Sequence, residues 1–265
     1  AGIMTGIDTE LYPKAETRHS KTSSAFKNAK KALRDERISG LTGAFLAFFI
    51  LGHLILESSI LVSAELYETV AYFMEHTVPM AQPLIFIVTI VFFIHFIWAG
   101  RKIPGKLRER KKMLELGEKL KDSRKGWNQD PNSDIKLRSH FETSLWITQV
   151  RTGMIVLATG AFHLFLVMWN IFSDMGVDGQ TVGLTQEVAS ARVESGLWIL
   201  YAILMVSVVA HMAIGVYRLL VKWFADTWFV RNYAKALFYF LFWFYTILGA
   251  ATVIAMAGPL EGILS

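Results

Sequence analysis

Five uncharged stretches, each long enough to cross a lipid bilayer, dominate this sequence. They are residues 38–56, 77–100, 152–173, 195–217 and 236–260. A transmembrane helix needs about 20 consecutive, predominantly apolar residues. Hydrophobic residues make up 53% of the 265-residue chain, a larger share than a soluble domain usually carries. The pattern predicts an all-α integral membrane protein, a bundle of five transmembrane helices.

Lysine and arginine are distributed unevenly between the segments that flank these stretches. Residues 1–37 hold eight of them, residues 101–138 hold thirteen and residues 218–235 hold four, whereas residues 59–76 hold none. Short basic segments stay on the cytoplasmic side of a membrane. We therefore expect the N-terminus inside and the C-terminus outside, with a cytoplasmic N-terminal arm at 1–37 and a membrane-spanning bundle at 38–260.

Two features of the composition exclude whole classes of function. The chain has no cysteine, so it cannot ligate iron–sulfur clusters through thiolates or attach a c-type haem covalently. The net charge of +5 follows the predicted topology and does not indicate a nucleic-acid partner. The polar, basic N-terminal segment also lacks the apolar run of a cleavable signal peptide.

The basic cytoplasmic connector at 101–140, between the second and third helices, has two compatible interpretations. It can be a solvated segment that obeys the positive-inside rule, or a docking platform for a peripheral partner. Part of it is expected to form an amphipathic helix. No internal repeat is evident from the sequence alone.

Four of the seven histidines lie inside the apolar stretches, one in each of the first four. Two of them are expected in the outer half of the membrane. The first helix enters from the inside after Arg37, so a rise of 1.5 Å per residue places His53 about 24 Å from the inner face. The third helix runs outward, and His163 lies eleven residues before Asp174.

The other two histidines are expected near the inner face. His95 lies six residues before Arg101 at the inner end of the second helix, which is about 9 Å. His211 lies seven residues before Arg218 at the inner end of the fourth helix. Topology therefore sorts the four residues into an outer pair and an inner pair.

Two histidine pairs at two depths are what two b-type haems with bis-histidine ligation require. His53 and His163 would ligate the iron of an outer haem, and His95 and His211 the iron of an inner haem. With both axial positions filled, such a haem transfers electrons and has no open site for oxygen. A buried histidine is tolerated in this role because metals bind the neutral imidazole.

Other interpretations of the histidines remain open. A single intramembrane histidine can make a polar contact within the bundle. A haem-free proton transporter can use histidines as a relay, although such a relay would be expected to include acidic residues in the membrane, and the cores of these stretches contain none. A purely structural anchor is a third possibility.

Haem propionates are anionic and favour nearby cations or hydrogen-bond donors. Lys222 and Arg101 have a simpler interpretation as side chains that snorkel to the interface. The candidates for contacts with propionates or the haem pocket are Arg151, Arg218, Lys222, His140 and Trp146.

The segments around these histidines resemble the dihaem cytochrome b subunit of quinol:fumarate reductase and succinate:menaquinone reductase, in its five-helix form. The matching stretches are "GHLILESSIL" around His53, "IHFIWAGRKIP" around His95, "SLWITQVRTG" with "GAFHLFLVM" around His163, and "HMAIGVYRLLVKW" from His211. Together they cover the first four helices.

The resemblance implies an oxidoreductase complex in the cytoplasmic membrane of a bacterium, with this chain as its multi-pass membrane anchor. Menaquinol would be oxidised near the outer, distal haem. Electrons would pass through the inner, proximal haem to an iron–sulfur subunit and a flavoprotein subunit on the cytoplasmic side, where fumarate is reduced. A dimer of the complex is a further expectation. The alternative is a cytochrome b partner of a hydrogenase or a formate dehydrogenase.

Quinol oxidation releases two protons, so a base is needed near the ring hydroxyls. The resemblance places this base in the outer loop between the first two helices. Counted from His53 it is Glu75, with His76 as a neighbour that could assist. Counted back from His95 it is Glu68. We expect Glu75.

Some dihaem relatives carry a glutamate two residues before the last haem ligand and use it to move protons across the membrane. That position is Val209 here. Glu57, one helical turn outward from His53, is a candidate for a replacement proton route.

Overall fold

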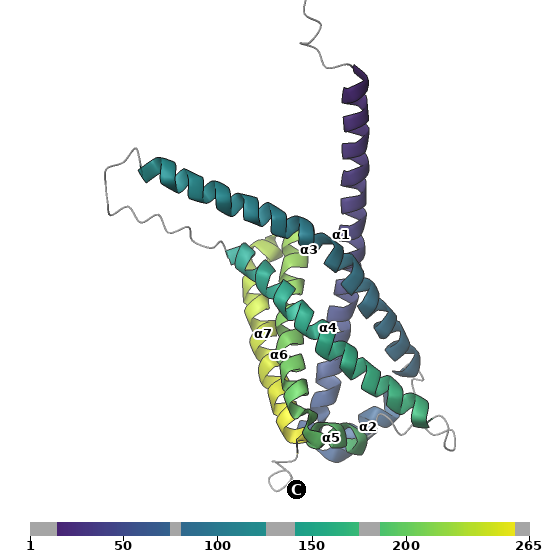
Figure 1. Ribbon diagram of the computed structural model, residues 1–265. Helices are drawn as coiled ribbons and strands as arrows, with labels where there is room; N and C mark the ends of the chain where they lie inside the picture. The colour runs from purple at the N-terminus through teal and green to yellow at the C-terminus, as the bar shows by residue number, and fades with distance from the viewer. Residues whose placement is uncertain (1–14, 75–80, 126–140, 175–185, 258–265) are drawn as a thin grey trace, which may run out of the picture.

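In the computed structural model, residues 15–74, 81–125, 141–174 and 186–257 are described (Figure 1). All secondary structure in these ranges is helical, and five of the helices are long and apolar enough to cross a membrane. The expected all-α architecture with five transmembrane helices is confirmed. The α-helices are α1 (Ala15–Glu57), α2 (Ala64–Tyr72), α3 (Ala81–Lys125), α4 (Phe141–Asp174), α5 (Gln186–Arg192), α6 (Trp198–Trp223) and α7 (Trp228–Met256).

Two of the long helices extend well beyond the apolar stretches. Helix α1 begins at Ala15, so much of the expected N-terminal arm continues the first transmembrane helix. Helix α3 runs on through the basic connector to Lys125 and has Pro104 in its interior. Proline removes a helix hydrogen bond and commonly marks a kink, and α3 changes direction in this region (Figure 1).

Short elements close one end of the bundle, the one that the distribution of charge predicts to face outward (the outer end). A 3₁₀ turn at Ser58–Leu61 leads into α2, whose first turn is capped by Ser63 accepting from the backbone N–H of Leu66. A π-helical turn at Val193–Leu197 joins α5 to α6, and Gly196 has a φ of 95° there. This left-handed conformation favours glycine because it has no Cβ.

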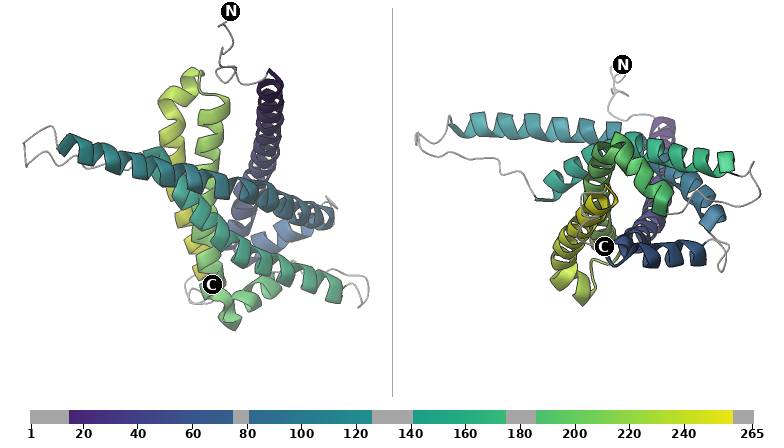
Figure 2. Two further views of the ribbon diagram at one scale, coloured as in Figure 1. Left: turned by 45° about the horizontal axis from the view of Figure 1, so that its top comes forward. Right: turned by 90° about the horizontal axis from the view of Figure 1, so that it is seen from below.

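The long helices pack in pairs. Helix α1 packs along α3, α4 packs along α6, and α6 also packs along α7 and touches α1 (Figures 1 and 2). Figure 1 shows α2 and α5 at one end of the molecule. The start of α1 and the part of α3 after Pro104, its basic arm, lie at the other. This separation agrees with five passes through one bilayer.

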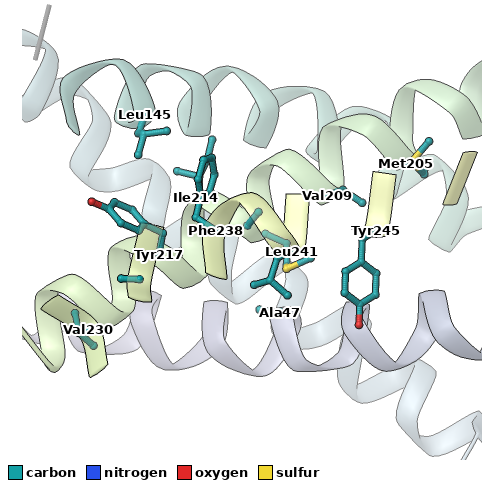
Figure 3. Close-up of a cluster of buried hydrophobic side chains, with 13 residues drawn as sticks. Ala47, Leu145, Met205, Val209, Ile214, Tyr217, Val230, Phe238, Leu241 and Tyr245 are labelled. Carbon is teal, nitrogen blue, oxygen red and sulfur yellow. The ribbon is translucent and has the colours of Figure 1, made fainter. Parts of the chain in front are cut away.

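The apolar core lies mainly between α6 and α7, with single contributions from α1 and α4 (Figure 3). Val209 and Ala213 of α6 are fully buried there, at 0% exposure. Many large apolar side chains point outward instead, as expected for a surface that faces lipid rather than water. They include Phe48, Ile90, Phe165, Trp169, Trp243 and Ile247.

Candidate functional site

The inner histidines meet between α3 and α6. The ring centres of His95 and His211 lie 6.3 Å apart, with the ring planes at 85° to each other. An imidazole nitrogen binds a first-row metal at about 2 Å, so two imidazoles on one metal ion have ring centres about 6 Å apart. The structure thus brings this predicted pair to a separation at which both rings could bind the same metal ion.

Each inner histidine has its Nδ1 occupied by a backbone carbonyl of another helix. Nδ1 of His95 donates to the carbonyl of Ser39 on α1 at 3.1 Å. Nδ1 of His211 donates to the carbonyl of Gln149 on α4 at 2.9 Å. A carbonyl can only accept, so Nδ1 carries the proton of the neutral ring and Nε2 keeps its lone pair. Nε2 is then the nitrogen available to a metal.

A protein-only metal site is not formed here. Within the ranges that the structure describes, no three histidine or carboxylate side chains are grouped so that they could hold an ion. Two imidazoles alone leave a transition metal with incomplete coordination. A metal held by His95 and His211 would therefore need further ligands from a non-protein group.

The pair predicted for the outer side, His53 and His163, lies on α1 and α4. His53 and His163 are close enough to interact electrostatically. The ring of His53 stacks on Phe49, with ring centres 5.4 Å apart and planes 10° apart. Nδ1 of His163 lies 3.3 Å from the hydroxyl of Tyr201 on α6. Each ring thus has a neighbouring side chain of its own.

Glu57 connects His53 to the short helix α2. Its Oε1 lies 3.7 Å from Nδ1 of His53, and its Oε2 accepts a hydrogen bond of 3.0 Å from the hydroxyl of Tyr67 on α2. Burial and the adjacent Glu57 carboxylate raise the pKa of Tyr67 well above its usual range. Tyr67 therefore stays protonated and acts as a donor.

Cations gather at the inner end, beyond the inner histidines. Nζ of Lys222 lies 2.6 Å from Oε1 of Glu36, and Nζ of Lys102 lies 3.3 Å from Oε2 of the same carboxylate. Lys106 interacts electrostatically with this carboxylate and with both lysines, and Arg218 interacts electrostatically with Lys102 and Lys106. Three lysines thus lie around one carboxylate with Arg218 beside them, and this cluster of four cations and Glu36 has an excess of positive charge that favours an anionic ligand.

The remaining predicted residues are less closely tied to the histidines. Arg151 is exposed on α4 and Trp146 is half-buried on the same helix. Glu68 is exposed on α2. Glu75 and His140 lie outside the described residues.

Sequence reasoning missed Trp98, which lies one helical turn beyond His95. Its indole Nε1 is buried without a hydrogen-bond partner in the described part of the chain, and the guanidinium of Arg101 lies 5.1 Å from the ring centre. A buried N–H of this kind usually has an acceptor. The spacing of three residues from a predicted ligand was the available signal, because it puts both side chains on one helix face.

Comparison with known proteins adds an independent observation. The model of the succinate dehydrogenase/fumarate reductase transmembrane subunit family matches residues 129–251, from before α4 into α7. The fumarate reductase cytochrome b subunit of Helicobacter pylori is 29% identical over 193 residues, and that of Wolinella succinogenes is 28% identical over 189 residues. The resemblance to fumarate reductase cytochrome b subunits is confirmed.

These cytochrome b subunits are longer than the region they share with this chain. The alignments cover 70% and 69% of this chain, and 65% and 63% of the relatives from H. pylori and W. succinogenes. The matched family segment contains His163 and His211 and ends well after the second of them. With five apolar helices, the comparison identifies a multi-pass membrane protein.

Proposed function

We propose that this chain is the membrane anchor and electron-transfer subunit of a quinol:fumarate reductase complex. It would oxidise menaquinol and pass electrons through two haems b to iron–sulfur and flavoprotein subunits. The observation that carries this proposal is the inner histidine pair, with ring centres 6.3 Å apart and both Nδ1 atoms engaged by carbonyls.

The residues around the inner pair fit a haem in three respects. Both Nε2 atoms are left as metal ligands, as argued from the hydrogen bonds of Nδ1. The unpartnered indole N–H of Trp98 could donate to an anionic oxygen. The cation cluster around Glu36 offers the positive charge that two propionates need. Arg218 and Lys222, predicted as propionate contacts, belong to this cluster.

The protein side of electron transfer follows from these residues. Haem supplies one-electron transfer when it is bound. His95 and His211 would hold the inner haem and His53 and His163 the outer haem, so that oxygen finds no open coordination position. The backbone carbonyls that hold Nδ1 of His95 and His211 would keep these two imidazoles in place as ligands.

Quinol oxidation also needs a proton acceptor at the outer end. Glu75 is our candidate, since it follows α2 in the outer segment between the first two long helices. Glu57 is the candidate for a proton route, because its carboxylate reaches both His53 and Tyr67. Carboxylates near a reacting hydroxyl are effective general bases.

The partner subunits would dock at the inner end. The basic arm of α3 and the start of α1 project there beyond the bundle (Figure 2), and the cation cluster lies at the same end. An iron–sulfur subunit must come close to the inner haem to receive electrons, so the cytoplasmic side is the side it requires. A dimer of the whole complex belongs to the same proposal.

The test is a dithionite-reduced minus oxidised spectrum of the purified full-length chain, with haem quantified per chain. Two b-type haems per chain are expected, and a chain without haem would overturn the proposal. Menaquinol-dependent fumarate reduction by the complex then distinguishes it from the alternative, a cytochrome b of a hydrogenase or formate dehydrogenase.

A further inference from the structure

The carbonyls that hold the inner histidines belong to two segments with the same organisation. On α1, Thr42 follows Ser39 by three residues, and its Oγ1 lies 3.2 Å from Nδ1 of His95. On α4, Thr152 follows Gln149 by three residues, and its Oγ1 lies 3.5 Å from Nδ1 of His211. Each imidazole N–H therefore faces a carbonyl and a hydroxyl from one neighbouring helix.

Both threonine hydroxyls are committed as acceptors toward the histidines. Thr42 donates its own proton to the carbonyl of Ile38 at 2.7 Å, and Thr152 donates to the carbonyl of Thr148 at 2.8 Å. A hydroxyl has one proton, so its remaining lone pair is what the imidazole meets. The two threonines thus reinforce the tautomer that leaves Nε2 free.

A glycine follows each threonine and lies directly against the imidazole. A Cβ on Gly43 would come within 2.9 Å of Cε1 of His95, and a Cβ on Gly153 would come within 2.8 Å of Cε1 of His211. These contacts are with the histidine rings and not with the backbone of the neighbouring helix. General helix packing therefore does not explain why these two positions are glycine.

The correspondence extends along both helix pairs. His53 follows Gly43 by ten residues on α1, and His163 follows Gly153 by ten residues on α4. Lys102, seven residues after His95, donates to the hydroxyl of Ser39.

In the second pair, Arg218, seven residues after His211, donates to the side-chain carbonyl of Gln149. The α1–α3 pair and the α4–α6 pair thus repeat one arrangement of ligand, acceptor and cation. This internal repeat was not evident in the sequence alone.

We infer that Thr42–Gly43 and Thr152–Gly153 form a duplicated clamp that positions the two inner histidines as ligands of a single haem. The inference rests on the proposed function and names four positioning residues for it. Acceptors on Nδ1–H fix the orientation of a metal-bound imidazole and raise its basicity. The glycines let the ring approach the helix closely enough for both acceptors to be reached.

The glycines are tested by Gly43→Ala and Gly153→Ala in the full-length chain within its complex. Each should reduce the content of the inner haem several-fold while the outer haem is kept. Gly100→Ala is the matched control, because a Cβ there would meet nothing within 4 Å, and it should keep both haems. Full retention of the inner haem in both clamp variants would overturn the inference.

The threonines are tested by redox titration. If their role were merely structural, their substitution would not shift the midpoint potential of one particular haem. Thr42→Val and Thr152→Val each remove one acceptor of Nδ1–H and should shift the midpoint potential of the same, inner haem to more positive values. Thr42→Ser and Thr152→Ser should restore it.

Two outcomes of this titration separate the clamp from the proposed function. The clamp alone is overturned if the wild-type chain has two haems but the valine variants leave the midpoint potential of the inner haem unchanged. The same holds if the two variants shift the potentials of different haems. A wild-type chain without haem overturns the proposed function and the clamp with it.

Discussion

Tyr67 donates a hydrogen bond of 3.0 Å to Oε2 of Glu57, and thereby joins α2 to the end of α1. The other carboxylate oxygen lies 3.7 Å from Nδ1 of His53. The 3₁₀ turn at Ser58–Leu61 folds the chain back and makes this contact possible. Glu57 therefore connects His53 to α2 through its two carboxylate oxygens.

Replacing Glu57 with glutamine removes the negative charge beside His53 and keeps the shape of the side chain. We expect the midpoint potential of the outer haem to become more positive, since a carboxylate near an axial imidazole favours the oxidised metal. Turnover should fall about 10-fold, the lower range for such supporting partners. Redox titration and quinol-dependent fumarate reduction measure the two effects.

Tyr67→Phe is the matched control, because it keeps the carboxylate and removes only its hydrogen bond. It should change the outer haem less than Glu57→Gln. If Glu57→Gln leaves turnover and its dependence on the membrane potential unchanged, Glu57 has no part in a proton route.

Removal of either member of a histidine pair should remove the same haem. His53→Ala and His163→Ala should both lose the outer haem and keep the inner one, because one axial ligand is insufficient to retain a b-type haem without a covalent bond. His95→Ala and His211→Ala should lose the inner haem. Reduced-minus-oxidised spectra and potentiometry distinguish the two haems, and loss of different haems within a pair would contradict the pairing.

Two substitutions in the cation cluster should affect retention of the inner haem differently. Lys222→Gln removes the cation that lies 2.6 Å from Glu36, and it should weaken retention of the inner haem by about 2 kcal/mol, or roughly 30-fold. Glu36→Gln removes the carboxylate from the cation cluster and should retain the haem at least as well as the wild type. Haem content after detergent dilution measures both.

Lys112→Gln serves as the charge control for this pair of variants. Lys112 is exposed on the arm of α3, so the same change of net charge should leave haem retention unaltered. A loss equal to that of Lys222→Gln would show that total charge, and not this cluster, matters.

The sequence was sufficient to predict the five helices and the approach of His95 to His211, because both follow from apolar length and the distribution of charge. The backbone carbonyls of Ser39 and Gln149 that accept from the histidines could not be predicted in this way, because every residue type has such a carbonyl. The repeat is also sparse, as few residues besides a Thr–Gly dipeptide and a His–Leu dipeptide ten residues after its glycine recur on α1 and α4. Those few identities gain meaning once the structure shows equivalent contacts.

Substitutions of Glu75 and Glu68 should show which of the two is the base for quinol oxidation. Glu75→Gln should lower menaquinol oxidation by about 100-fold or more while both haems are retained, because the substitution removes a proton acceptor and no haem ligand. Glu68, exposed on α2, should tolerate the same change. Steady-state oxidation of a menaquinol analogue measures both, and the reverse result would identify Glu68 as the base.

Val209 lies in the apolar core between α6 and α7 with 0% of its surface exposed. A glutamate at this position, which the resemblance associates with proton transfer in some relatives, would be surrounded here by buried apolar side chains. Burial of an unpaired polar or charged group is costly. Val209→Glu should therefore destabilise the chain by about 3 kcal/mol or more, whereas Val209→Ala should cost only about 1 kcal/mol.

The measurement is the fraction of chain that stays folded with its haems after heating in detergent, compared between the two variants. Val209→Glu should lower the folded fraction more than Val209→Ala does. Alanine leaves the larger cavity, but the penalty for glutamate comes from its polarity and not from its volume. Equal stability of Val209→Glu and wild type would mean that polar partners or water reach this position. The core of α6 and α7 would then be compatible with a proton path beside His211.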